Sequence, residues 1–130
     1  MSAEEDLIRE IWRRWNTGER QWDPELFDAE AEVHSALTGG VFKGEEQILV
    51  WQDEIDQQFE HWEISAIKIE RLSSGRVLVD GTIKARGRGS GLVLDQPASW
   101  TAELRDGRLW RLRNFIGQGS ARDAADRLGW

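Results

Sequence analysis

Residues 75–116 read GRVLVDGTIKARGRGSGLVLDQPASWTAELRDGRLWRLRNFI and contain three runs in which apolar and polar side chains alternate. This alternation is typical of strands, because successive side chains point to opposite faces of a sheet. The runs cover residues 76–86, 98–105 and 108–116, and a Gly-rich link at residues 87–91 follows the first of them. Asp106-Gly107 favours a tight hairpin turn before the third run, because both positions of such a turn need positive φ. A curved antiparallel sheet is therefore expected here.

The residues before this meander predict helices that cover one face of the sheet. Apolar side chains recur at helical spacing over residues 3–17, and Gly18 is suited to end that helix. Asp23-Pro24 predicts a short second helix over residues 24–28, because Asp is a good N-cap and proline suits the first helical position. A third helix is expected to begin at Gly44. Its predicted buried stripe comprises Ile48, Trp51, Gln52, Ile55 and Phe59.

Further elements are expected on both sides of the meander. Residues 32–37 predict a first strand, and residues 41–43 predict a brief second one. Residues 62–72 predict a longer strand whose period of two slips near Ala66, which indicates a β-bulge. Ser120 predicts the N-cap of a short C-terminal helix that ends at Leu128-Gly129. The expected fold class is α+β, with residues 1–130 forming a single domain.

The composition narrows the possible chemistry. The 130 residues include eight tryptophans, two histidines, no cysteine and no tyrosine. The lack of cysteine excludes thiolate metal sites and a cysteine nucleophile, and the two histidines have no suitably spaced third ligand, so no metal or cofactor is expected. A net charge of −7 disfavours non-specific binding to nucleic acid. The acidic start and the lack of a long apolar run predict a cytoplasmic protein without a signal peptide or membrane span.

Six short motifs carry a family resemblance. They are WNTGE at 15–19, ELFD at 25–28, FKGEE at 42–46, GRGSG at 87–91, LRDGR at 104–108 and ADRLG at 125–129. With them the chain resembles, over nearly all of its length, a SnoaL-like domain of the nuclear transport factor two-like superfamily, which also contains ketosteroid isomerase, scytalone dehydratase and limonene epoxide hydrolase. The resemblance implies a cone-shaped fold in which a curved antiparallel or mixed sheet is wrapped by three N-terminal helices, with a short C-terminal helix. It also implies a pocket on the concave sheet face and homodimers formed through the other face.

The resemblance also locates the positions where family members carry catalytic groups. The basic aspartate of the isomerases lies on the first strand, which places it near His34, Ser35 or Ala36, with the register left open. SnoaL-type cyclases use an aspartate on the last strand, and the matching position holds Asn114, whose amide can hydrogen-bond but cannot accept the proton. Trp100 occupies the fifth-strand position that holds an acid in the isomerases.

Two hypotheses of different class follow. In the first, the protein is a cofactor-independent isomerase, cyclase or dehydratase for a small hydrophobic molecule, polyketide-like or steroid-like. His34 is then the base, because imidazole titrates near neutral pH, while Asn114 and Trp100 orient the substrate oxygen. In the second, the protein is a non-catalytic small-molecule-binding or structural dimer of the same fold.

The predicted substrate-binding residues are mainly aromatic. They are Trp15, Trp51, Trp100, Trp110 and Leu112. On the predicted register, Trp100, Trp110, Leu112 and Asn114 share the concave face of the sheet. The alternative is that the tryptophans fill the core, since an aromatic stripe at regular spacing is typical of buried structure.

Overall fold

The computed structural model describes residues 3–19, 21–36, 39–73, 75–116 and 121–123. Within them, six strands form one mixed sheet in the order β2-β1-β6-β5-β4-β3. The strands are β1 (Phe27–His34), β2 (Val41–Lys43), β3 (Phe59–Ser73), β4 (Arg76–Gly87), β5 (Val93–Arg105) and β6 (Arg108–Ile116). β1 runs parallel to β6, whereas every other neighbouring pair is antiparallel. The α+β class and the mixed sheet predicted from the sequence are confirmed.

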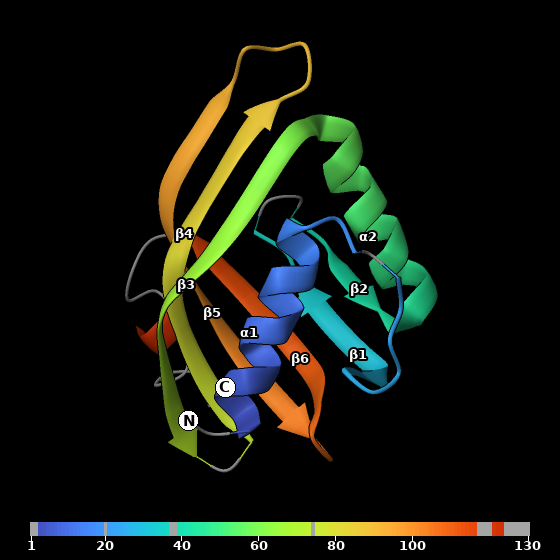
Figure 1. Ribbon diagram of the computed structural model, residues 1–130, viewed down its shortest axis with the longest axis vertical. Coiled ribbons are helices and arrows are strands. Elements are labelled where there is room, and N and C mark those ends of the chain that lie inside the picture. The colour runs from blue at the N-terminus through green and yellow to red at the C-terminus, as the bar shows by residue number, and fades with distance from the viewer. Residues whose placement is uncertain (1–2, 20, 37–38, 74, 117–120, 124–130) are drawn as a thin grey trace.

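Two helices lie on one side of this curved sheet (Figure 1). They are α1 (Ala3–Asn16) and α2 (Gly44–Gln58). Gly18 ends α1 as predicted, with a φ of 81° and its N–H donated to the carbonyl of Trp15 at 3.3 Å. α2 also begins at the predicted Gly44, but it stops one residue before Phe59, which is the first residue of β3.

The predicted short helix over residues 24–28 is wrong. Residues 24–26 form a single turn, in which the N–H groups of Leu26 and Phe27 donate to the Asp23 carbonyl at 3.1 and 3.0 Å. Asp23 does act as a cap, since its carboxylate accepts the N–H of Glu25 at 2.9 Å. The turn ends there because Phe27 already pairs with Leu109 of β6. β1 therefore begins five residues before the predicted strand start at residue 32, and α1 and α2 are the only long helices among the described residues.

The hairpin between β5 and β6 has the predicted turn and an unpredicted bulge. Asp106 and Gly107 have φ values of 54° and 75°, as a tight turn of this type requires. The register then shifts, so that Leu104 pairs with Leu109 while Glu103 pairs with Arg111. The extra residue is Trp110. Leu109, which is 1% exposed, consequently fills the core position at this point of β6.

The predicted bulge near Ala66 is confirmed on β3. The β3–β4 register shifts between Ala66 and Lys68, which leaves Ile67 as the extra residue. Gly81 of β4 lies opposite Ala66, where a Cβ atom would come within 1.8 Å of the Ser65 carbonyl oxygen. The bulge and the glycine together let the two strands approach closely while the sheet curves. β5, in contrast, starts at Val93 and not at the predicted residue 98.

The main core lies between the helices and the concave face of the sheet. The alternation predicted for β4 is confirmed, because Val77, Val79 and Ile83 belong to this core. Residues 121–123 are helical, and the Ala121 N–H donates to the Ser99 hydroxyl at 3.1 Å. The rest of the predicted C-terminal helix, including Ser120 and the motif at 125–129, lies outside the described residues. Neither α1 nor α2 has the length and hydropathy that crossing a bilayer requires, and this holds for the described residues alone.

Candidate functional site

A small cavity lies between the two helices and the concave face of the sheet. Its volume is about 20 Å³. Eleven residues from α1, α2, five strands and the position just after β1 line it: Trp15, Val33, Ser35, Trp51, Ile55, Trp62, Ile64, Ile83, Trp100, Leu112 and Asn114. A space of about 10–15 Å³ is enough for one water molecule, so the cavity has room for a single water-sized molecule.

Indole rings occupy most of the space that a larger pocket would need. Trp15 meets Trp51 edge to face, with ring centroids 5.5 Å apart, and Trp12 meets Trp100 in the same way at 5.2 Å. Edge-to-face packing of this kind is a favourable arrangement for aromatic rings. The two sequence-based interpretations of the tryptophans are thus compatible: Trp15, Trp51 and Trp100 are core residues, and they also line what remains of the pocket.

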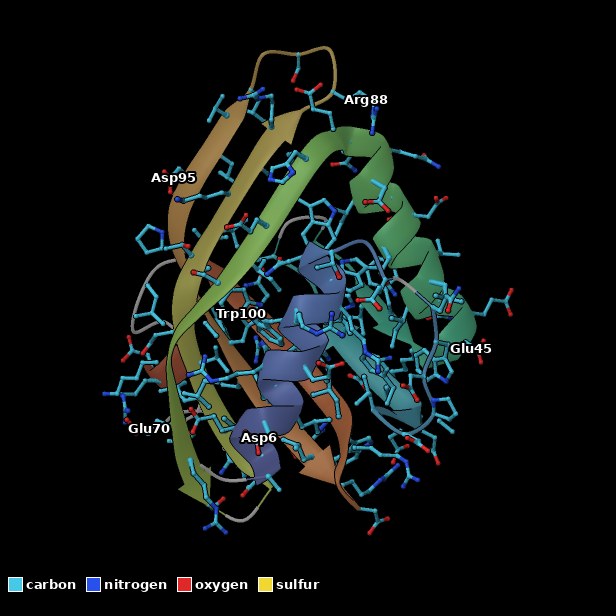
Figure 2. All side chains as sticks on the ribbon, viewed as in Figure 1. Asp6, Glu45, Glu70, Arg88, Asp95 and Trp100 are labelled. Carbon is cyan, nitrogen blue, oxygen red and sulfur yellow. The ribbon has the colours of Figure 1, made fainter. Side chains whose placement is uncertain are left out.

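Trp100 and Asn114 lie side by side at this cavity, as the strand register predicted. Figure 2 shows Trp100 on the side of the sheet that α1 covers. With its amide oriented to satisfy both neighbours, Asn114 accepts the Trp100 indole N–H at 3.1 Å and the Phe115 N–H at 3.0 Å. This orientation replaces long contacts from the amide nitrogen to the carbonyls of Ser99 and Phe115, at 3.3 and 3.4 Å. The indole donor that was predicted to hold a substrate oxygen is therefore bonded within the protein.

The two other indoles on the α2 side differ in their hydrogen bonding. The Trp62 N–H donates to the carboxylate of Asp56 at 2.9 Å. Trp51 is 6% exposed, and its Nε1 is buried without a hydrogen-bond partner among the described residues. The cavity lining therefore includes a buried indole donor that the protein itself leaves unpaired.

His34, the predicted base, is not among the residues that line the cavity. Val33 and Ser35 are the cavity-lining residues of this segment, and alternation along the strand turns the His34 side chain to the opposite face. There His34 Nε2 forms a hydrogen bond with Glu32 Oε1. Burial raises the pKa of the Glu32 carboxyl, but the bond to His34 and the charges of Lys43 and Arg111 outweigh it, so the pKa lies below its ordinary value.

Trp110 also lies outside the cavity, contrary to the prediction that it shares a face with Leu112 and Asn114. The bulge in β6 moves its ring onto the surface side, between the guanidinium groups of Arg105 and Arg111. Their central carbons stand 4.4 and 4.3 Å from the ring centroid, within the range of cation–π contacts.

The predicted set missed several lining residues. Trp62 and Ile64 alternate in the sequence, and Ile83 shares its predicted face with Val79, so the signal for their inward orientation was present. Ser35 was among the alternatives for the first strand. No side chain of this lining is titratable, and no group of three or more potential metal ligands occurs within the described part of the chain.

The fold and the site together define an α+β domain with a small aromatic cavity on the concave face of its sheet. Neither a protein-family model nor a curated protein sequence matches the chain. Solved structures do match it over almost its whole length, although their sequences are less than a quarter identical. Their similarity therefore establishes the fold.

Three of these structures illustrate the relationship. Bal32a, from a soil-derived mobile gene cassette, is 23% identical with a TM-score of 0.78, covering 93% of this chain and 94% of its own. A protein named as a SnoaL-like polyketide cyclase, from Shewanella putrefaciens, is 14% identical with a TM-score of 0.74, covering 99% and 98%. TerC, co-crystallised with polyporic acid, is 14% identical with a TM-score of 0.78, covering 96% and 99%. The chain thus has the nuclear transport factor two-like fold of the SnoaL-like proteins, as the sequence resemblance implied.

Proposed function

We propose that the protein binds a compact, uncharged and largely apolar molecule in the Trp-lined cavity. The observation that carries this proposal is the lining itself, in which four indoles and five aliphatic side chains surround two neutral polar ones. Small-molecule sites are typically concave and mostly apolar, with a few polar groups that fix orientation. TerC, a protein of the same fold that was co-crystallised with the organic small molecule polyporic acid, supports the proposal.

The lining favours binding without acid–base catalysis. General acid–base catalysis needs a titratable group within hydrogen-bond reach of the substrate. By the family resemblance, Asn114 matches the position at which SnoaL-type cyclases carry their aspartate, and its amide cannot take a proton. His34 lies on the opposite face of the sheet, bonded to Glu32. This arrangement makes the non-catalytic hypothesis the better supported of the two.

The small size of the cavity implies that binding moves side chains. A volume of about 20 Å³ holds one water, so a ligand of several heavy atoms enters only if one or more indoles shift. Because indole fluorescence responds to the surroundings of the ring, such a shift is measurable as a saturable change in tryptophan emission.

The test is a titration with toluene and with cyclopentanone, followed by tryptophan fluorescence and by calorimetry. We expect saturable binding that Ile83→Phe weakens, because the larger side chain fills the cavity. Trp110→Phe is the matched control, since that ring lies outside the cavity and its loss should leave affinity unchanged. If neither probe binds saturably, or if Ile83→Phe leaves binding intact, the proposal is wrong.

A cofactor-independent isomerase, cyclase or dehydratase acting on a polyketide-like or steroid-like molecule is the second candidate. The similarity to a protein named as a polyketide cyclase favours it. In this hypothesis Asn114 orients a substrate oxygen and His34 removes the proton, which requires the substrate to reach the far side of the sheet. Turnover of an enolisable ketone above the buffer rate, abolished by His34→Ala, would support this second candidate.

We further propose a cytoplasmic homodimer that associates through the outer face of the sheet, as the family resemblance implies. This face carries charged side chains such as Glu103 and Arg111, which form an ion pair of 2.7 Å. Sedimentation equilibrium on the full chain tests the dimer: a single species at monomer mass across the micromolar range would contradict it.

A further inference from the structure

The unpaired indole N–H of Trp51 is the starting point. Trp51 lies on the inward side of α2, lines the cavity and is 94% buried, since only 6% of its surface is exposed. Its Nε1 has no hydrogen-bond partner among the described residues. A buried donor left unpaired is costly, because it has given up its hydrogen bond to water without a replacement.

Two other indole donors and a serine at the cavity already have partners. The Trp100 indole N–H donates to Asn114 at 3.1 Å, and the Trp62 indole N–H donates to Asp56 at 2.9 Å. Ser35 has a partner as well. A molecule that enters the cavity therefore meets aromatic and aliphatic surface together with the buried indole donor of Trp51, which lacks an acceptor.

A water molecule would satisfy this donor only poorly. Buried waters typically make about three hydrogen bonds, whereas the Trp51 ring packs against the rings of Trp15 and Phe42, whose centroids lie 5.5 and 6.4 Å from its own, and the cavity lining is mostly apolar. A water held by so few bonds is readily displaced, and replacing it with an acceptor on an otherwise apolar ligand favours binding.

We infer that Trp51 selects the ligand by donating its indole N–H to an acceptor oxygen, so that the ligand is a compact neutral ketone or ether. This inference rests on the proposed function and assigns the chemical class of its ligand. An alcohol fits less well, because it brings an O–H donor that must also find an acceptor inside a mostly apolar cavity.

The test compares cyclopentanone with methylenecyclopentane, which have nearly the same shape but carry C=O and C=CH₂ respectively. Their affinities are measured by ligand-observed NMR titration for the parent protein, Trp51→Phe and Trp110→Phe. The ratio of the two affinities cancels the effect of the added space in Trp51→Phe, as in a double-mutant cycle. We expect the ketone-to-alkene ratio to fall about fivefold in Trp51→Phe, the loss of one ordinary hydrogen bond, and to stay unchanged in Trp110→Phe.

The outcomes separate this inference from the proposed function. If both probes bind the parent protein but the ratio is the same in Trp51→Phe, the cavity binds ligands and Trp51 is not the donor. If neither probe binds the parent protein, the proposed function fails and the inference falls with it. If Trp51→Phe does not fold, benzothienylalanine at position 51 keeps the ring shape without the N–H, and the same fall in the ratio is required.

Discussion

Asp28 at the start of β1 and Arg105 at the end of β5 form an ion pair across the intervening β6. Two hydrogen bonds, of 2.9 and 3.0 Å, join the Arg105 guanidinium to the carboxylate. The Arg105 hydrogen bond, helped by the Glu30 backbone N–H, holds the pKa of Asp28 below its ordinary value of 3.8. Since the folded-state pKa is lower than the unfolded one, the ionised carboxylate stabilises the fold above pH 3.8, and this contribution is lost as the pH falls through the folded-state pKa.

Asp28→Asn is therefore expected to lower the unfolding temperature at pH 7, and the difference from the parent protein should shrink towards zero at pH 2. Thermal unfolding followed by circular dichroism at both pH values measures this. Glu30→Gln is the control, because Glu30 is 83% exposed and 3.9 Å from Arg105, and it should change little at either pH. A difference between Asp28→Asn and the parent that is equal at pH 7 and pH 2 would contradict the assignment.

At the scale of elements, the bulge in β3 depends on the lack of a side chain at Gly81. A Cβ atom there would lie 1.8 Å from the Ser65 carbonyl oxygen, and backbone cannot move aside as a flexible side chain can. Gly81→Ala should cost about 3 kcal/mol or more, measured by urea unfolding. Gly89→Asn is the matched control, because that loop position has open space and a φ of 71° that Asn tolerates. Near-parent stability of Gly81→Ala would show that the strands can separate at little cost.

Hydrogen bonds of the Asn16 side chain connect the end of α1 to β3. Its amide donates to the Ile64 carbonyl at 2.6 Å and accepts the Ile64 N–H at 2.8 Å, so one side chain replaces a missing strand neighbour. Asn16→Ala should cost about 1–2 kcal/mol, because two backbone groups lose their partner. Asn16→Asp keeps the acceptor for the Ile64 N–H but places a carboxylate oxygen against the Ile64 carbonyl, so this variant should also be less stable than the parent protein. Equal stability of all three proteins in urea would refute this role.

The sequence predicted those elements whose signals are local. Asp106-Gly107 marks its turn by chemistry, and the slip near Ala66 is visible in the alternation itself. The start of β1 at Phe27 could not be predicted in this way, because it depends on pairing with β6, more than 80 residues away.

The same limit applied to the residues of the site. A difference of one residue in register decides whether a side chain faces the core, so the sequence left the first-strand position open among His34, Ser35 and Ala36. A bulge that arises only from the β5–β6 pairing displaced Trp110.

At the scale of the whole molecule, the tryptophans leave a cavity of about 20 Å³, which holds one water and no organic ligand unless side chains move. Leu112 is 1% exposed and lines this cavity, so Leu112→Ala should enlarge it and cost about 2–5 kcal/mol. Empty apolar cavities made by such truncations can take up benzene, and a ligand that binds only the folded state raises its stability. Benzene at about ten times its dissociation constant should therefore restore about 1.4 kcal/mol to Leu112→Ala.

Leu109→Ala is the control for Leu112→Ala. It distinguishes the effect of added space beside the tryptophans from the effect of lost core packing elsewhere. Leu109 is equally buried at 1% exposure, but it does not line the cavity. Both variants should unfold at lower temperature than the parent protein, and benzene should raise the unfolding temperature of Leu112→Ala more than that of Leu109→Ala. Equal shifts in the two variants would mean that benzene binds elsewhere. No shift in either would mean that the tryptophans close over the added space, in which case this fold has been packed into a solid core and its function lies on the outer surface.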